Sequence, residues 1–410
     1  YAERLGHVYY ENYIGSIIDW YAATLFRREP FVHIEGSENV GRRFFSSFVD
    51  DCDLQGTSLT DFFRGLFVNA MVTGTSYILI DFPRCAQRPD NRAAEEELGT
   101  SRAYLVGYQS EDLINWSLDE MGNAEWIVLR TTRLRQPSIE DPMATAETRW
   151  SYYDKERFRI YRRVARFGEP GEPELVDEGY HGLAKLGRVP LVEVKIGDGM
   201  WLMNRAGTLQ LEHFNKSNAL SWALTMGLFA TPVVYSEKDF KQAMGESYYI
   251  QLGPQDRFGW TEPEGKVYQI AADNLQRLQN EIYRVCYVLS QSGNGGTVVQ
   301  SGLSKQRDYA ITQEVLRAYG DSVKDAMKRV LRWIAEGRED GLTLDVSGLD
   351  EFDIGDFGAE IEDASKLLEL EPNSPTLRQQ ILKKLALKYL CDVRQDLKDR
   401  IAAEIDAAQS

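Results

Sequence analysis

Few side chains in this sequence have the types and the spacing that catalysis or metal binding requires. Asp50, Asp51 and Asp53 form an acidic group whose carboxylate oxygens suit a divalent cation. A solvated loop is the favoured interpretation of the same three residues. If they do bind a metal, the chain is a metal-dependent hydrolase that uses Asp50, Asp51 and Asp53, and Asp51→Asn would abolish its stabilisation by Mg²⁺ or Mn²⁺.

Histidines and cysteines give no metal motif. The four histidines are His7, His33, His181 and His213, and only His213 has a neighbouring ligand type, Glu212. Adjacent residues on a helix point about 100° apart, so this pair cannot chelate one ion, and we expect His213 at an interface or in the core. The four cysteines are scattered and form no CxxC pair. The sequence therefore predicts no metal, no cofactor and no enzyme activity.

A glycine-rich run is the one segment with the composition of a phosphate-binding loop. Residues 292–302 read SGNGGTVVQSG and carry no charge. The run Gly293-Asn294-Gly295-Gly296 follows a helical pattern instead of a strand, and no GxxxxGK[ST] motif occurs. We therefore expect a flexible connector that cannot bury enough surface to order itself.

Charge limits the ways in which the chain can handle nucleic acid. Lysine and arginine number 47 and aspartate and glutamate 63, which gives a net charge of −16. A protein that grips phosphates usually has the opposite sign, whereas an acidic surface lets DNA slide; simple solubility is the other interpretation. Residues 149–166 are locally basic, with seven basic residues against two acidic. They are either a phosphate-facing strip or, as we favour, the solvated face of a strand in which Arg157 and Arg159 alternate with apolar residues.

Hydrophobic periodicity places these residues on elements in the first half of the chain. Helices are expected at 9–28 and 56–74, the second capped by Ser58 or Thr60 and ended by Gly74. Strands are expected at 76–82, 104–108, 114–118, 125–131, 158–164 and 192–196. Residues 136–148 and 168–190 are rich in Pro, Gly and Glu and are predicted to be loops.

The second half is predicted to be mainly helical. A long helix at 201–229 precedes a Pro/Gly-rich stretch, 231–272, with short strands at Tyr248–Leu252 and Lys266–Ile270. Asp273 then caps a helix at 273–290, and a helix of about 50 Å covers 304–337. Within 339–371, twelve residues are acidic and one is basic, and Leu342–Val346 is a strand candidate. Helices are expected at 359–370, 375–389 and 391–407. The chain has no apolar run of 18 residues.

This order of elements resembles the portal proteins of tailed bacteriophages. The segments that carry the resemblance are WYAATLFRREP at 20–30, FFRGLFVNAMVTGTSYILIDFP at 62–83, AYLVGYQSEDLINW at 103–116, LQLEHFNKSNALSWALTMGLFATPVV at 209–234 and SGLSKQRDY at 301–309. The resemblance covers roughly residues 10–400 and rests on architecture and diffuse similarity, with a shorter clip and a modest crown.

The resemblance implies an α+β subunit of the portal type. Its parts would be a wing at 1–200, a first stem helix at 201–230, a clip at 231–272 and a second stem helix at 273–290. A tunnel loop at 291–303, a long wing helix with a strand at 304–358 and a crown at 359–410 would follow.

Function and partners are implied in the same way. A ring of twelve copies at one capsid vertex would pass double-stranded DNA during packaging, retention and ejection. The terminase large subunit, a head–tail adaptor and the major capsid protein would be its partners, in the virion and, during assembly, in the host cytoplasm, with no membrane. The residues expected to face the channel are Gly293, Asn294, Gly295, Gly296, Thr297, Gln300 and Ser301. Aromatic residues expected at clip or intersubunit contacts are Tyr248, Tyr249, Phe258 and Trp260.

Two other function classes remain open from the sequence. One is the metal-dependent hydrolase built on Asp50, Asp51 and Asp53. The other is a non-viral scaffold or adaptor, which would stay monomeric or dimeric and would use residues 231–272 to bind a partner without closing a ring.

Overall fold

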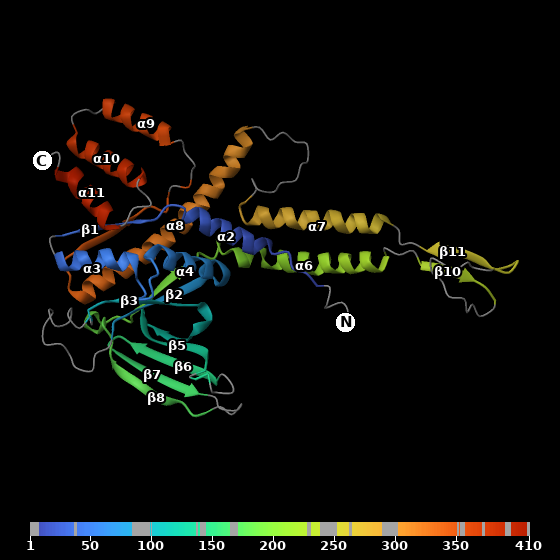
Figure 1. Ribbon diagram of the computed structural model, residues 1–410, viewed down its shortest axis with the longest axis horizontal. Coiled ribbons are helices and arrows are strands. Elements are labelled where there is room, and N and C mark those ends of the chain that lie inside the picture. The colour runs from blue at the N-terminus through green and yellow to red at the C-terminus, as the bar shows by residue number, and fades with distance from the viewer. Residues whose placement is uncertain are drawn as a thin grey trace. The chain divides into compact units, whose positions relative to one another are not determined.

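A computed structural model gives the arrangement of helices and strands (Figure 1). It describes residues 8–36, 39–83, 99, 101–136, 138–139, 145–164, 171–227, 231–237, 252–261, 265–288, 302–350, 352, 357–370, 374–389 and 395–407. The chain is a mixed α and β protein that divides into two compact units. The first unit comprises residues 1–17 and 204–308, and the second comprises residues 18–203 and 309–410.

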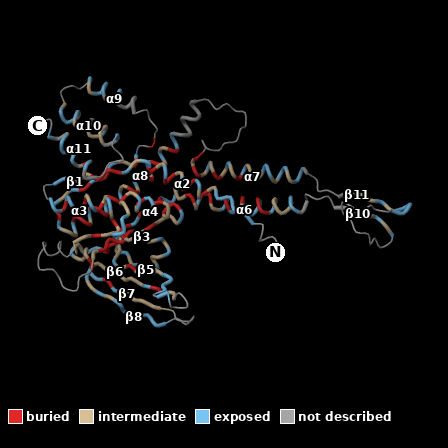
Figure 2. Tube along the Cα trace, viewed as in Figure 1, coloured by how far each residue is buried: buried red, intermediate tan, exposed pale blue. Residues whose placement is uncertain are grey.

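Aromatic packing between helices forms the core of the second unit. The helices concerned are α2 (Tyr13–Leu25), α4 (Leu59–Thr73) and α8 (Gly302–Arg338). Tyr319 of α8 contacts the ring of Tyr21 at 5.4 Å and that of Phe67 at 5.5 Å, both edge to face, and all three side chains are buried. Figure 2 shows buried residues concentrated along these helices. The core therefore joins segments that lie about 300 residues apart in sequence.

The ends of α4 follow from local chemistry, as the sequence predicts. The Ser58 hydroxyl accepts a hydrogen bond from the Asp61 N–H and so caps the first turn. Gly74 ends the helix in the left-handed conformation with φ 87°, and its N–H donates to the carbonyl of Ala70. Strand β2 (Thr75–Asp81) begins at the next residue.

Two antiparallel sheets pack against each other beside this core. In the smaller sheet the strand order is β3–β2–β9, formed by β2, β3 (Tyr104–Tyr108) and β9 (Leu191–Lys195). The larger sheet is a meander of β4 (Leu113–Leu118), β5 (Ala124–Arg135), β6 (Thr145–Asp154), β7 (Arg157–Val164) and β8 (Glu174–Tyr180). Leu79 of the small sheet and Ile127, Leu129, Tyr153 and Phe158 of the large one bury their side chains in one cluster.

Two strands lie in segments that the sequence predicts to be loops. Strand β8 falls within 168–190, and β6 starts within 136–148. Both predictions were wrong because strand formation here depends on a neighbour: β6 pairs along its full length with β5, and β8 pairs as an edge strand with β7. Charged and glycine residues are tolerated at such an edge. Strand β1 (Phe31–Glu35) and helix α3 (Asn39–Asp50) add further elements.

The C-terminal part follows the predicted order. After α8, strand β12 (Thr343–Ser347) pairs with β1 in antiparallel fashion. Helices α9 (Phe357–Leu370), α10 (Pro375–Tyr389) and α11 (Gln395–Ala407) complete the chain. Lys398 of α11 is nearly buried and its Nζ lies 3.4 Å from a carboxylate oxygen of Glu29.

The first unit contains two long helices and a two-stranded ribbon. Helix α6 (Leu202–Gly227) leads to strand β10 (Thr231–Tyr235), and strand β11 (Arg257–Thr261) leads to helix α7 (Gly265–Val285). The strand predicted at Lys266–Ile270 is wrong, because these residues form the first turns of α7, and Asp273 lies inside the helix instead of capping it. Val267, Ile270 and Ala271 recur at the i, i+3, i+4 spacing of a helix, which is the physical reason that the segment is helical. Of the other predicted strand, Tyr248–Leu252, only Leu252 is among the described residues.

Among the described residues, no helix has the length and apolarity needed to cross a membrane.

Candidate functional site

All seven residues expected to face a channel lie outside the described part of the chain. This holds for Gly293, Asn294, Gly295, Gly296, Thr297, Gln300 and Ser301, and also for Tyr248 and Tyr249. Their roles stay predictions.

Phe258 and Trp260 lie on β11 of the ribbon. In the register of the ribbon, Phe258 pairs with Val234 and Trp260 with Pro232 of β10. Tyr235, at the end of β10, has 66% of its surface exposed. No third strand pairs with this ribbon among the described residues. An isolated two-stranded ribbon is marginally stable in water, so its faces need a further surface to pack against.

Four buried polar residues mark one face of α6. Gln210, His213, Ser217 and Asn218 are separated by three, four and one residues, which places them on one side of the helix. Their exposed fractions are 4%, 3%, 3% and 8%. Buried polar groups of this kind need hydrogen-bond partners, because an unpaired one costs about 1–3 kcal/mol.

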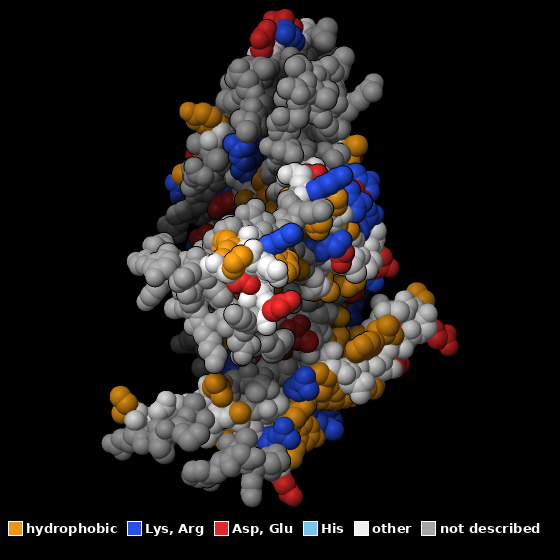
Figure 3. Space-filling model, turned by 90° about the vertical axis from the view of Figure 1, so that its right-hand side faces the viewer, with side chains coloured by type: hydrophobic (Ala, Val, Ile, Leu, Met, Phe, Trp, Pro, Cys, Tyr) orange, Lys and Arg blue, Asp and Glu red, His pale blue; other side chains and the backbone are white. Residues whose placement is uncertain are grey.

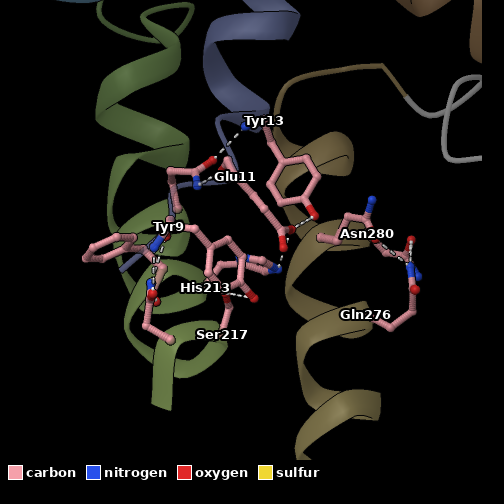
Figure 4. A network of polar contacts seen from close by, with 11 residues as sticks. Tyr9, Glu11, Tyr13, His213, Ser217, Gln276 and Asn280 are labelled. Carbon is pink, nitrogen blue, oxygen red and sulfur yellow. Dashed lines mark hydrogen bonds and ion pairs between the residues drawn. The ribbon is translucent and has the colours of Figure 1, made fainter. Parts of the chain in front are cut away.

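The partners come from the extended segment that precedes α2, residues 8–12 (Figure 4). The Asn218 side chain accepts from the Tyr9 N–H at 3.0 Å and donates to the Tyr9 carbonyl at 2.9 Å. Gln210 accepts from the Tyr13 N–H at 3.2 Å and donates to the Glu11 carbonyl at 2.7 Å. Each of the two side-chain amides thus both donates a hydrogen bond to the segment's backbone and accepts one from it, as the backbone of a neighbouring strand would. We call this set of contacts the amide clasp.

His213 occupies the middle of the clasp, where three elements meet. Its Nε2 lies 3.9 Å from a Glu11 carboxylate oxygen, and its ring meets the Tyr13 ring edge to face at 5.0 Å. The Tyr13 hydroxyl donates to Glu11, and the Tyr13 ring contacts that of Tyr283 on α7 at 6.2 Å. Burial raises the pKa of Tyr13, and the Glu11 carboxylate adds to this effect. Burial lowers the pKa of His213 against the opposing attraction of Glu11. His213 was expected in the core or at an interface, and the structure places it in the core.

The clasp joins α6 to residues 9–13, the contact between the Tyr13 and Tyr283 rings links these residues to α7, and we assign the clasp a structural role. The sequence signal for it was the spacing of Gln210, His213, Ser217 and Asn218, four polar residues on one side of a long helix. Their partners lie about 200 positions away, so the spacing alone could not identify them.

Helix α7 also carries a buried apolar stripe. Leu278 and Ile282 are buried, as is Cys286 directly after the helix, and Lys216 of α6 donates a hydrogen bond to Asn274 of α7 at 3.0 Å. Burial raises the pKa of the Cys286 thiol to about 12, so it stays protonated and behaves as a packing residue.

Large apolar side chains remain exposed on both helices of the first unit. Val267 and Ile270 of α7 are 65% and 60% exposed, and Leu211 of α6 is 60% exposed. Hydrophobic side chains also stand among basic and acidic ones on the face shown in Figure 3. Apolar side chains this exposed on the two long helices are candidates for contact with another protein.

The acidic group at 50–53 closes a turn. One Asp53 oxygen accepts from the N–H groups of Gln55 and Thr57, and Asp51 accepts from the Gly56 N–H and pairs with Arg102 at 3.0 Å. Partial burial acts to raise the pKa of Asp53, but hydrogen bonds from Thr57 and Gln55 outweigh it and lower that pKa. In the described part of the chain, no group of three or more His, Cys, Asp or Glu side chains is arranged to hold a metal ion.

The buried histidines predict how stability depends on pH. Burial lowers the pKa of His181 as it does that of His213, and the Nε2 of His181 lies 3.0 Å from the Asp154 carbonyl. In the unfolded chain a histidine has a pKa of about 6.5, so below that pH the unfolded state binds more protons than the folded state. We expect the free energy of unfolding to fall as pH decreases below about 6.5. Each histidine contributes at most about 1.4 kcal/mol per pH unit.

Chemical denaturation between pH 7.5 and 5.0 measures this slope. His181→Gln removes one of the titrating groups and should make the slope shallower. An unchanged slope would show that the proton uptake on unfolding comes from other groups.

Comparison with known proteins gives structural likenesses alone. No protein-family model matches the sequence, and no curated protein does. A chain in the neck of an empty gene transfer agent (GTA) particle, computed with C6 symmetry, shares 11% identity over 88% of this chain and 85% of its own, with a TM-score of 0.43. A chain of the native GTA virion shares 12% identity over 87% and 84%, with a TM-score of 0.41. A chain in the neck of the native particle, computed with C12 symmetry, shares 12% over 89% and 88%, with a TM-score of 0.43.

Proposed function

We propose that this chain is one subunit of a ring-shaped portal of a tailed bacteriophage, which lets the genome pass through one capsid vertex. The observation that carries the proposal is the helix–ribbon–helix group of α6, β10–β11 and α7. Together with residues 1–17 this group forms one compact unit, and its residues interrupt the larger α+β unit in sequence. A portal subunit of the kind proposed has two stem helices joined by a small β clip, and this group has that order of elements.

Exposed surfaces of the first unit support assembly with other copies. Val267, Ile270 and Leu211 stand exposed on the helices, and the ribbon is too small to have a core of its own. In a closed ring each copy presents one surface to the preceding copy and a different surface to the next, so both would be covered.

The regions then take the roles that the resemblance implies. Helices α6 and α7 would be the stem, the ribbon would be the clip, and residues 291–303 would be the tunnel loop. The two sheets and α8 belong to the wing, and α9–α11 form the crown. The net charge of −16 per copy suits a channel through which DNA moves without sticking.

Partners and location follow from the same proposal. The clip would dock the terminase large subunit during packaging and a head–tail adaptor afterwards, and the wing would meet the major capsid protein. The energy for DNA movement would come from the terminase, so the chain itself would not be an enzyme. It would reside in the virion and, during assembly, in the host cytoplasm.

Native mass spectrometry and negative-stain imaging of the purified chain test the proposal. We expect a ring of about twelve copies with a central hole and no ATPase activity. A compact dimer that persists at high protein concentration would contradict the ring, and ATP turnover sensitive to point substitution would contradict the non-enzymatic role.

A further inference from the structure

Six arginines gather at one end of the five-stranded sheet. They are Arg130, Arg133, Arg135, Arg149, Arg162 and Arg163, on β5, β6 and β7. We call them the arginine cluster. Because the whole chain carries a net charge of −16, this end of the sheet differs in sign from the molecule around it.

The strand register brings like charges together within the cluster. Arg149 of β6 stands directly opposite Arg162 of β7. Like charges in such cross-strand positions destabilise a sheet. Sequences that break a local rule of this kind tend to do so at functional sites.

Two carboxylates partly offset the cluster. The Glu147 carboxylate forms ion pairs with Arg149, at an N···O distance of 2.6 Å, and with Arg135, at 3.4 Å. Its side chain is only 8% exposed. The Glu174 carboxylate accepts a hydrogen bond from the Arg162 Nε at 3.0 Å. Even with Asp81 and Asp112, which line the adjoining cavity, six arginines against four carboxylates leave an excess of positive charge. Glu147 pairs with two of the guanidinium groups and so orients them.

Three members of the cluster have no carboxylate partner among the described residues: Arg130, Arg133 and Arg163. The Arg163 guanidinium lies over the Trp150 ring at 5.0 Å from its centre, which orients it without neutralising it. A planar guanidinium with free N–H donors matches the oxygens of a phosphate group in two-point contacts.

The cluster occupies both faces of the sheet, which indicates the shape of its ligand. Along β5, Arg130 and Arg133 point to opposite faces because side chains alternate. Arg133, Arg135 and Arg149 also line a cavity of about 720 Å³, whose lining includes Asp81 and Asp112. A positive field that extends around the end of a sheet fits an extended chain of phosphates better than a single small anion.

We propose that the arginine cluster binds the phosphate backbone of double-stranded DNA. This goes beyond the proposed function, because a bore that lets DNA slide requires no site that holds it. The proposal does not depend on ring formation, since all six arginines lie in one compact unit of one chain.

The test measures binding of a 30-base-pair DNA duplex to the full chain by fluorescence anisotropy, over a series of salt concentrations. The variant is Arg130→Gln, Arg133→Gln and Arg163→Gln together, which leaves both carboxylates paired. Its matched control is Arg43→Gln, Arg64→Gln and Arg332→Gln, three exposed arginines outside the sheet with the same change of charge. Circular dichroism and native mass spectrometry on the same samples report folding and assembly separately.

We expect the cluster variant to bind about tenfold or more weakly at 50 mM salt. Its slope of log affinity against log salt should be shallower by about 2 to 3, since three phosphate contacts are lost. The control should keep the wild-type slope. Equal losses in the two variants would overturn the proposal, as would a wild-type chain that binds polyglutamate in place of DNA, which would assign the surface to an acidic protein.

Discussion

Replacing Val267 and Ile270 of α7 with aspartate is expected to abolish ring assembly while leaving the subunit folded. Both side chains are more than half exposed in the single chain, so a carboxylate at either position costs little in the isolated subunit. In a ring, the same two carboxylates would be buried against the next copy. An unpaired buried charge costs several kcal/mol, and this cost recurs at every subunit contact.

Native mass spectrometry measures the outcome, with circular dichroism to confirm that helical content is unchanged. Val40→Asp and Val72→Asp are the matched control, since these two valines are 42% and 44% exposed on helices of the other unit. We expect the control to assemble. If the α7 variant forms rings as readily as the control, this face of α7 does not lie at a subunit contact.

Removing Arg338 is expected to produce the largest loss of stability among single polar substitutions. Its Nε lies 2.7 Å from Asp340 Oδ2, and both side chains are almost fully buried, at 3% and 0% exposed. The guanidinium also lies 3.8 Å from the centre of the Phe44 ring and donates to the Ser101 carbonyl. One side chain thus joins the end of α8 to α3 and to the segment before β3.

Arg338→Met leaves the Asp340 carboxylate buried without its cation, and losses of about 3–5 kcal/mol accompany such a change. Denaturant unfolding followed by circular dichroism measures it. The double variant Arg338→Met, Asp340→Asn should recover a large part of the loss, because it removes the buried charge together with its partner. Arg317→Met is the control: its pair with Glu314 is exposed, and we expect a change of about 0–1 kcal/mol. A loss for Arg338→Met no larger than for Arg317→Met would show that the buried pair contributes little.

What the sequence determined by itself was the local structure. Ser58 and Gly74 set the ends of α4 because capping and left-handed conformations depend on one or two neighbouring residues. The long helices α6 and α8 and the strands β2 and β12 followed from apolar periodicity for the same reason. The mixed α and β class follows from these elements together.

Only the tertiary structure decided which segments pair. Strand β8 exists because β7 supplies hydrogen-bond partners, and its own composition indicated a loop. The buried side chains of Gln210 and Asn218 find their partners in residues 9–13, about 200 positions away. The cross-strand position of Arg149 and Arg162 depends on the register of β6 with β7. Pairing and register depend on the free energy of contacts between distant segments, which no local pattern of residue types contains.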